Sequence, residues 1–399
     1  MPQLWQPSLD ERYTLADPKD LARDISARRR ELGDRLIILG HHYQVDEVVR
    51  HADFLGDSLK LSQLAAERVA AQGCEFVVFC GVHFMAETAD LLTPDDVSVI
   101  LPDLSAGCSM ADMADYEDAI DAWEALHEEL AAQGWRGRIV PVTYVNSTAA
   151  IKAFVGDRGG AVCTSGNAKR IFEWALEGGA TPLEPGEDVK VLFLPDQHLG
   201  RNTAASFGME VARETCLYDP RRARKGERLG GATPEQLRES RAILWAGHCS
   251  VHKLFRAEHC DEARASEIRI LVHPECDKSV VDKSDLAGST EFILKTIREA
   301  PAGSRWAIGT EVHLVQRVAR EAAERGVHVR ILSDCQCLCT TMYRIDEPHL
   351  LWVLDNLSQG KVVNRVRVHP EAREPALLAV RRMLDLSPAG APPAAVRAG

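Results

Sequence analysis

The segment LIILGHHYQ, residues 36–44, joins a short apolar run to a loop of glycine, histidine and tyrosine. The same order of apolar run, polar loop and helical pattern recurs along the chain. The other runs lie at residues 76–79, 97–101, 139–142, 161–163, 189–194, 242–245, 268–272, 306–308 and 327–332. Strands that alternate with helices are typical of α/β units with parallel sheets.

These runs fall into three groups, and each group repeats the same succession of loops. A first loop carries groups suited to catalysis, at residues 41–43, 144–146 and 273–275. A second loop is a small-residue turn that opens a helix, at residues 56–58, 164–167 and 288–290. The third loops hold His83, His198 and His313, and the fourth loops hold Cys108, Cys249 and one of Cys335, Cys337 and Cys339.

Ligands of open parallel sheets bind beyond the carboxyl ends of the strands. We therefore predict three α/β domains, related by a pseudo-threefold axis, whose strand ends meet at one centre. The first domain comprises residues 1–121 with an N-terminal helix, the second residues 122–262, and the third residues 263–386 with C-terminal helices. Residues 387–399, SPAGAPPAAVRAG, cannot bury a core and are predicted to be a disordered tail. Residues 199–240 are predicted to form a solvated connection.

Composition excludes several classes of protein. The 399 residues include 47 Lys and Arg against 59 Asp and Glu, a net charge of −12, with 45% hydrophobic residues. This balance is typical of a globular chain with two or three compact units. The one dense basic run, RRARKGER at 221–228, is too short to follow a nucleic-acid backbone, so no nucleic-acid partner is expected.

Apolar patterning gives no reason to expect a membrane protein. No stretch reaches the roughly 18 apolar residues that a membrane span needs, and residues 1–20 lack the features of a signal peptide. We therefore predict a cytoplasmic protein with no membrane partner. Reducing conditions there disfavour disulfides, so the eleven cysteines call for another explanation.

One thiol from each domain would supply three thiolates at the predicted centre. Three thiolates with one vacant position favour an iron–sulfur cluster with an iron open to substrate. Zinc remains the rival metal, because three protein ligands plus water also form a catalytic zinc site. A reversible disulfide between Cys335 and Cys337 stays open. The remaining cysteines are interpreted as core or incidental thiols, namely Cys74, Cys80, Cys163, Cys216, Cys260 and Cys276.

Three polar residues follow predicted strands directly, so their side chains should point into the shared crevice. They are His41, His273 and Glu275. The small-residue turns present backbone N–H groups and hydroxyls, which suit phosphate or carboxylate ligands. The sequence therefore predicts a site for anionic substrates.

Motifs from all three groups closely resemble the quinolinate synthase family, over roughly residues 20–365. They are GHHYQ (40–44), GDSLKLS (56–62), FCGVHFMAETA (79–89), LPDLSAGCSMAD (101–112), YVNSTAAIKA (144–153), LPDQHLGRN (194–202), GHCSVH (247–252), HPEC (273–276), AGST (287–290) and CTTM (339–342). The resemblance implies three related α/β/α sandwiches around one 4Fe-4S cluster per chain. It also implies that iminoaspartate condenses with dihydroxyacetone phosphate to quinolinate, the precursor of the NAD ring, with loss of phosphate and water.

Residue roles follow from the same resemblance. The implied cluster ligands are Cys108, Cys249 and Cys339, although this chain has C-x-C-x-C where some relatives have C-x-x-C-x-x-C. Cys339 is preferred over its neighbours because it lies three residues before Met342. The implied substrate-binding residues are His41, Ser58, Tyr144, Asn146, Ser165, His273, Glu275, Ser289 and Thr290, and the implied acids and bases are His41, Tyr43 and Glu275.

The resemblance also implies functional coupling to an aspartate oxidase or dehydrogenase, because iminoaspartate hydrolyses quickly in water. Two other readings use the same three thiols. One is a zinc-dependent aldolase or hydrolase, and the other is an iron–sulfur redox sensor without catalytic activity. A sensor would not need polar loops in all three domains.

Overall fold

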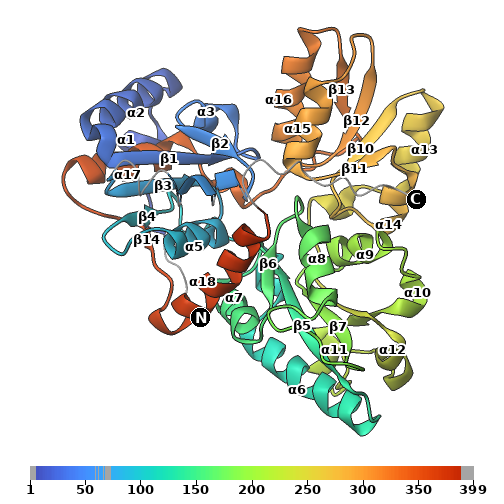
Figure 1. Cartoon of the computed structure of the whole chain (residues 1–399). Helices are drawn as coiled ribbons and strands as arrows, with labels where there is room; N and C mark the ends of the chain where they lie inside the picture. The colour runs from blue at the N-terminus through green and yellow to red at the C-terminus, as the bar shows by residue number, and fades with distance from the viewer. Residues whose placement is uncertain (1–5, 59, 62, 66, 68–72, 388–399) are drawn as a thin grey trace. The chain divides into compact units, whose positions relative to one another are not determined.

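The computed structural model describes residues 6–58, 60, 61, 63–65, 67 and 73–387 and confirms the α/β class (Figure 1). Every predicted apolar run forms a strand, and the strands make three mostly parallel sheets. Contacts divide the chain into two units. The first unit comprises residues 1–108, 311–317 and 338–369, and the second comprises residues 109–310, 318–337 and 370–399.

The first unit contains the first sheet, in the strand order β14-β4-β3-β1-β2. Its strands are β1 (Leu36–His41), β2 (Phe54–Gly56), β3 (Phe76–Cys80), β4 (Ser98–Ile100) and the antiparallel edge strand β14 (Arg365–Val366). The helices include α1 (Glu11–Thr14), α2 (Pro18–Leu32), α3 (Asp46–Val49), α5 (His83–Leu92) and α17 (Glu347–Ser358). Strand β1 is buried along its whole length, as expected of a central parallel strand.

Helix α2 shows how local sequence sets a boundary. Asp17 is the N-cap and accepts a hydrogen bond from the Lys19 N–H, and Pro18 occupies the first turn, where its missing N–H costs nothing. The helix ends at Gly33, whose φ of 55° suits a residue without a Cβ. Its buried side, which includes Leu21 and Ile25, fits its packing against α17.

The second unit contains the other two sheets. The second sheet has the order β6-β5-β7-β9-β8, from β5 (Gly137–Tyr144), β6 (Ala161–Cys163), β7 (Asp188–Leu194), β8 (Thr215–Tyr218) and β9 (Ala242–Trp245). Its helices are α6 (Tyr116–Ala132), α7 (Ala149–Asp157), α8 (Ala168–Leu176), α9 (Gln197–Ala205), α10 (Val211–Glu214), α11 (Pro220–Ala223), α12 (Pro234–Glu239) and α18 (Pro370–Asp385).

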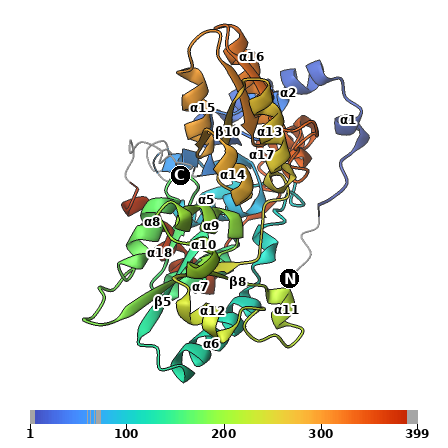
Figure 2. The ribbon, with the colours of Figure 1, turned by 90° about the vertical axis from the view of Figure 1, so that its right-hand side faces the viewer.

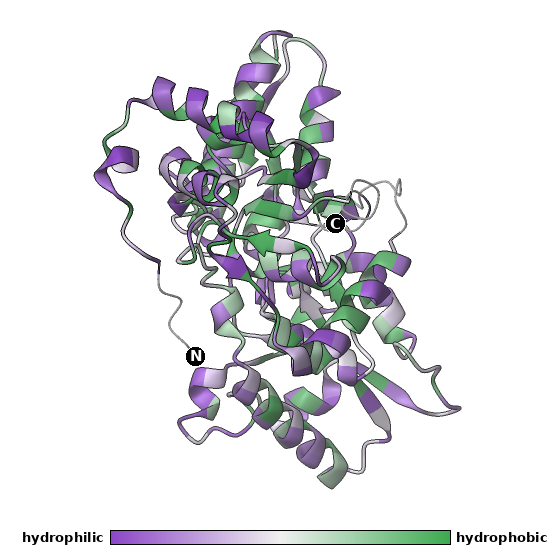
Figure 3. Ribbon diagram, turned by 90° about the vertical axis from the view of Figure 1, so that its left-hand side faces the viewer, coloured by the Kyte–Doolittle hydropathy of each residue, from purple (hydrophilic) through white to green (hydrophobic). Residues whose placement is uncertain are grey.

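The third sheet has the order β11-β10-β12-β13, from β10 (Arg269–Val272), β11 (Leu286–Ala287), β12 (Arg305–Gly309) and β13 (His328–Ile331). Helices α13 (Ala257–Ala265), α14 (Lys278–Lys283) and α15 (Thr290–Arg298) accompany it, and α16 (Val312–Ala323) crosses the boundary between the two units. Figure 2 shows α13 and α15 on opposite sides of β10. Apolar residues gather on the strands and polar residues on the helices (Figure 3).

All three sheets repeat one four-stranded arrangement. Without the edge strands β14 and β8, and counted along the chain within each repeat, the spatial order is second, first, third, fourth: β2-β1-β3-β4, β6-β5-β7-β9 and β11-β10-β12-β13. Strands β2 and β11 have only three and two residues, too few to show a periodic pattern in the sequence. The loops that follow them are nevertheless the predicted small-residue turns.

Residues 199–240 correct one expectation. They were predicted to be a solvated connection, but they include α9 and the edge strand β8, which pairs in parallel with β9. The TCLY sequence of β8 buries Cys216 and Tyr218 and exposes Leu217, the alternation of an edge strand with one covered face. The four residues of β8 lie between charged segments, and so short a pattern does not predict a strand.

Helix α18 packs against α7 and β6 of the second sheet. Its close approach depends on Gly156, where a Cβ would lie 1.9 Å from the Pro375 carbonyl oxygen. Beyond the helix, Ser387 is buried and accepts a hydrogen bond from Asn167 Nδ2 at 2.9 Å. The rest of the predicted tail, residues 388–399, lies outside the described residues. The predicted domain boundaries at 121 and 262 remain a prediction.

Within the described part of the chain, no helix combines the length and the apolar composition that crossing a membrane requires.

Candidate active site

Loops from two sheets bring their side chains together within the second unit. Tyr144 ends β5, Ser165 follows β6, His252 follows β9, Glu275 follows β10, and Thr310 follows β12. All five stand at carboxyl ends of parallel strands, the edge where sheets of this class bind ligands. Contacts between the loops join the second sheet to the third.

Glu275 lies at the centre of this site and is 3% exposed. Tyr144 Oη donates a hydrogen bond of 2.5 Å to its Oε1, and His252 Nδ1 lies 2.8 Å from its Oε2. Burial raises the pKa of the Glu275 carboxyl, but the facing imidazoles of His252 and His273 and the Tyr144 hydroxyl outweigh it and lower the pKa to about 2. Glu275 is therefore an ionised carboxylate at neutral pH.

His273 is almost completely buried beside this carboxylate. Its Nε2 lies 3.1 Å from Ser165 Oγ, and its Nδ1 accepts a hydrogen bond of 3.4 Å from the Glu275 N–H. This pattern places the ring proton on Nε2, which donates to Ser165. Burial lowers the pKa of His273 to about 3, against the opposing effect of Glu275. The ring is therefore neutral near pH 7.

His252 stacks on His273, with ring centroids 4.5 Å apart, and its Nε2 lies 3.1 Å from Thr310 Oγ1. The sequence analysis quoted GHCSVH but did not select this histidine, because nothing in the motif showed that it faces Glu275. Cys249, His252 and Glu275 each present one ligand atom, and these atoms lie within 4.8 Å of one another. Together they form a group able to hold a metal ion.

A second carboxyl that the sequence analysis missed is Asp196, at the N-terminus of α9. It is fully buried, and it accepts a hydrogen bond of 2.7 Å from the Leu199 N–H. Burial raises the pKa of Asp196 well above its usual value, and the nearby charge of Glu275 adds to this effect. The two buried carboxyls therefore differ, because the pKa of Asp196 is raised and that of Glu275 is lowered. The position of Asp196 just after β7 is the feature of the sequence that could have identified it as a candidate site residue.

Buried polar side chains hold the loops of this site in place. Asn202 Nδ2 donates to the carbonyl oxygens of Pro274 and Cys276, at 2.8 and 2.9 Å, on either side of Glu275. Lys152 Nζ donates to the carbonyl oxygens of Val145 and Ser147, on either side of Asn146. A buried donor that pairs with two loop carbonyls thus supports both the loop after β5 and the loop after β10.

Two predicted small-residue turns of the second unit also lie together. A Cβ on Gly166 would be 3.6 Å from Ser289 Oγ, so the turns at 164–167 and 288–290 are neighbours. Ser289 caps α15 by accepting a hydrogen bond from the Phe292 N–H, and Thr290 opens the helix. Asn146 is half-buried in the loop after β5. The seven predicted site residues of this unit other than Cys249 therefore lie at the carboxyl ends of strands or within a few residues after them.

The first unit carries the remaining predicted residues. His41 ends β1 and is buried, its Nδ1 accepts a hydrogen bond of 3.1 Å from the Tyr43 N–H, and the two rings meet edge to face at 4.7 Å. Ser58 is half-buried shortly after β2. Cys108 and Cys339 are both half-buried in this unit. Because Cys249 belongs to the other unit, a single centre for all three thiols remains a prediction.

All eleven cysteines are free thiols. The six interpreted as core or incidental thiols are buried, which confirms that interpretation, whereas Cys108, Cys249 and Cys339 are half-buried. Burial raises the pKa of Cys80 to about 12, so that thiol is inert at neutral pH. The Sγ atoms of Cys335 and Cys337 lie 3.4 Å apart.

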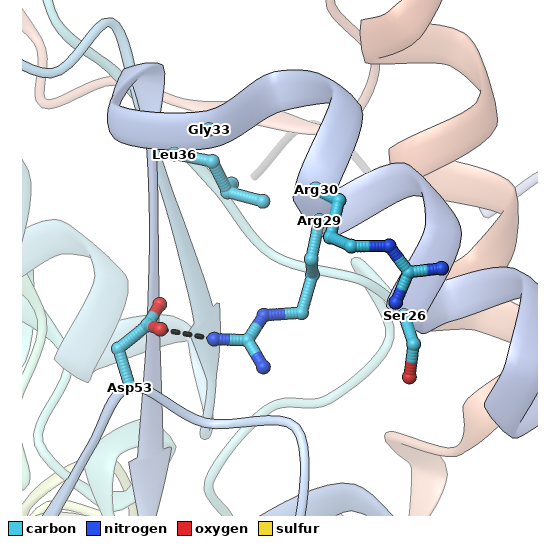
Figure 4. A pocket seen from close by; sticks show the side chains of 6 residues that line it. All are labelled: Ser26, Arg29, Arg30, Gly33, Leu36 and Asp53. Atoms are coloured by element: carbon cyan, nitrogen blue, oxygen red, sulfur yellow. Dashed lines mark hydrogen bonds and ion pairs between the residues drawn. The ribbon is translucent and has the colours of Figure 1, made fainter.

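A surface pocket of the first unit lies apart from the predicted residues (Figure 4). It is lined by Ser26, Arg29, Arg30, Gly33, Leu36 and Asp53. Arg29 already pairs with Asp53, whose other oxygen accepts a hydrogen bond from the Ile38 N–H. The pocket therefore has no catalytic arrangement comparable to that around Glu275.

The fold and the site define an α/β protein with a buried carboxylate and two histidines at the carboxyl edges of two sheets. A sequence model described as "Quinolinate synthetase A protein" matches residues 23–385, so the chain belongs to the quinolinate synthase family. The predicted family is confirmed. A quinolinate synthase from Acidobacterium capsulatum is 50% identical over 382 residues, covering 95% of this chain and 96% of the relative. One from a Nocardioides species is 53% identical over 376 residues, covering 93% and 90%.

Proposed function

We propose that the protein condenses iminoaspartate with dihydroxyacetone phosphate to form quinolinate, releasing phosphate and water. The observation that carries this proposal is the ionised, buried Glu275 between Tyr144 and His273, in a chain that belongs to the quinolinate synthase family. The reaction removes protons from carbon and delivers protons to oxygen. A fixed carboxylate with adjacent hydroxyl and imidazole groups suits both tasks.

Cys108, Cys249 and Cys339 would hold one 4Fe-4S cluster per chain. Each follows the fourth strand of its repeat, and each is a half-buried free thiol. Burial raises the pKa of the Cys339 thiol, and hydrogen bonds to its sulfur from the Met342 N–H and from Thr341 partly offset this effect. When bound, the cluster supplies an open iron that acts as a Lewis acid toward a substrate hydroxyl.

Substrate binding follows from the charges of the two substrates. Iminoaspartate carries two carboxylates and dihydroxyacetone phosphate carries a phosphate, so the site needs hydroxyl and N–H donors. Ser58 and Ser165 are assigned to the triose phosphate or its carbonyl end. The dicarboxylate portion is assigned to Tyr144, Asn146, His273, Ser289 and Thr290. The His273 Nε2–H, which donates to Ser165 Oγ, orients that hydroxyl.

Proton transfer is assigned to Glu275, Tyr43 and His41. The low pKa of Glu275 keeps its carboxylate unprotonated at neutral pH, the form that a general base requires, and Tyr144 Oη is fixed by its hydrogen bond to the same carboxylate. In the first unit, the N–H of Tyr43 orients the His41 ring by donating a hydrogen bond to its Nδ1.

The proposal also places the protein in the cytoplasm, in functional coupling with an aspartate oxidase or dehydrogenase that supplies the short-lived imine. Its decisive test is anaerobic purification with iron and sulfide analysis, followed by assay with preformed iminoaspartate and dihydroxyacetone phosphate. We expect about four irons and four sulfides per chain and formation of quinolinate. Colourless, iron-free protein with full activity would refute the cluster and favour the zinc reading.

A further inference from the structure

One part of the site can bind a metal without help from the first unit. Cys249, His252 and Glu275 all belong to the second unit, and their ligand atoms lie within 4.8 Å of one another. Cys249 and His252 are separated by two residues, a short spacing that lets both reach one ion. Thiolate, imidazole and carboxylate are all zinc ligands, with bonds of about 2.0–2.3 Å.

His252 directs a buried ring nitrogen toward the Glu275 carboxylate. The residue is 1% exposed, and its Nδ1 has no hydrogen-bond partner of good geometry among the described residues, although Glu275 Oε2 lies 2.8 Å away. A buried, unpaired ring nitrogen is costly unless something else satisfies it. A cation bound to both the nitrogen and the carboxylate oxygen would satisfy both atoms.

The surrounding contacts match those that support metal ligands. His252 Nε2 lies 3.1 Å from Thr310 Oγ1, so its N–H can donate to that oxygen while Nδ1 binds the metal. Glu275 Oε1 accepts the Tyr144 hydroxyl and leaves Oε2 for the metal. Ligating histidines and carboxylates are commonly held by such outer hydrogen bonds. Two of the three ligands therefore have their supports in place.

We propose that the cluster-free protein binds one Zn²⁺ ion through Cys249, His252 and Glu275, with an open fourth position, and that this ion excludes the iron–sulfur cluster. The zinc ion excludes the cluster because both would use the Cys249 thiolate. Only this exclusion, and not the zinc site itself, rests on the proposed function. Zinc bound here also occupies the Glu275 carboxylate. Zinc-loaded protein is therefore inactive until the ion is removed.

Zinc affinity separates this site from the three-thiol site. Cluster-free full-length protein is prepared anaerobically and titrated with Zn²⁺ against a chromophoric chelator. Loss of an outer partner of a metal ligand typically costs about 10- to 100-fold in affinity, so His252→Ala should weaken binding by more than about 100-fold and Thr310→Val by about 10- to 100-fold. Cys108→Ala and Cys339→Ala should bind zinc like the unmodified protein.

Differential alkylation provides a second measurement that needs no variant and so does not depend on whether His252→Ala folds. Zn²⁺ should protect Cys249 from iodoacetamide and leave Cys108 and Cys339 reactive, as read by mass spectrometry. Protection of all three thiols, or zinc affinity lost in Cys108→Ala and Cys339→Ala, would overturn the proposal in favour of a three-thiol site. Unchanged zinc affinity in folded His252→Ala would also overturn it.

Exclusion is tested separately by attempting cluster assembly on zinc-loaded protein. Brown colour and activity should appear only after a chelator removes the zinc. Cluster assembly that proceeds with zinc still bound would refute exclusion. If no cluster ever forms, the proposed function fails, whereas the zinc affinities and the alkylation pattern still decide the zinc site.

Discussion

His252 Nδ1 lies 2.8 Å from Glu275 Oε2, although one residue follows a strand of the second sheet and the other a strand of the third. Both side chains are almost completely buried. The contact therefore joins two repeats at the place where the parallel strands of each sheet end. It also explains why a single carboxylate can be held by groups from three different loops.

Loss of a cluster ligand should abolish both colour and activity. We expect Cys108→Ala, Cys249→Ala and Cys339→Ala each to fold, because each sheet keeps its own buried core, but to contain no intact cluster and form no quinolinate. Cys74→Ala and Cys260→Ala are the matched controls and should stay brown and active. Iron and sulfide analysis decides the outcome. An intact cluster in Cys339→Ala, with loss in Cys337→Ala, would identify Cys337 as the third ligand.

Exposure to air should bleach the protein and remove its activity, because an iron open to substrate is also open to oxidants. A dicarboxylate substrate analogue should slow the bleaching by occupying the open iron. Absorbance and turnover are followed together during aeration. Full turnover in bleached protein would argue against the iron–sulfur mechanism.

Removal of a proton-transfer group should lower kcat, whereas removal of a binding group should raise KM. Glu275→Gln keeps the shape of the side chain but cannot take up a proton, and Tyr43→Phe removes one hydroxyl. We expect kcat losses of about 10²- to 10⁴-fold for both. Ser289→Ala should mainly raise KM. Anaerobic steady-state kinetics measure the difference, and near-normal kcat in Glu275→Gln would remove that residue from the proton chemistry.

Asn202→Ala should disturb the loop that presents Glu275. The substitution leaves the buried carbonyls of Pro274 and Cys276 without their donor, at a cost of about 1–3 kcal/mol in the free energy of unfolding. We expect kcat to fall more than KM rises, because the reacting carboxylate shifts while the binding hydroxyls stay. Asn356→Ala is the control, since its amide donates only to Trp352 within α17. Equal kinetics in both variants would contradict a positioning role.

Acid should destabilise the protein partly through His198. Burial lowers the pKa of His198 to about 4, with an added effect from Arg201, whereas an unfolded histidine has a pKa near 6.5. The unfolded state therefore binds more protons between these values, and stability falls as pH drops from about 6.5 to 4. His198→Gln should reduce the dependence of the free energy of unfolding on pH between about 6.5 and 4, as measured by urea unfolding at a series of pH values. The same substitution at the exposed His328 should leave it unchanged.

Much of the architecture could be predicted from the sequence because the same local patterns repeat along the chain. Every predicted apolar run became a strand, since a run of three to six mostly apolar residues before a polar loop is typical of a buried parallel strand. The short strands β2, β8 and β11 were missed because two to four residues carry no reliable periodicity. Their positions depend on pairing with a longer neighbour, which is a tertiary interaction.

The sequence by itself determined the α/β class, the family and the loops in which the candidate residues stand, because strand patterns and motifs are local properties of the chain. It could not show that His252 lies between Thr310 and Glu275, that burial raises the pKa of Asp196, or that Asn202 holds the carbonyls beside Glu275. Only the tertiary structure decided these relationships. Burial and contact between residues tens of positions apart set their hydrogen bonds and pKa values, and neither property is written in any single segment.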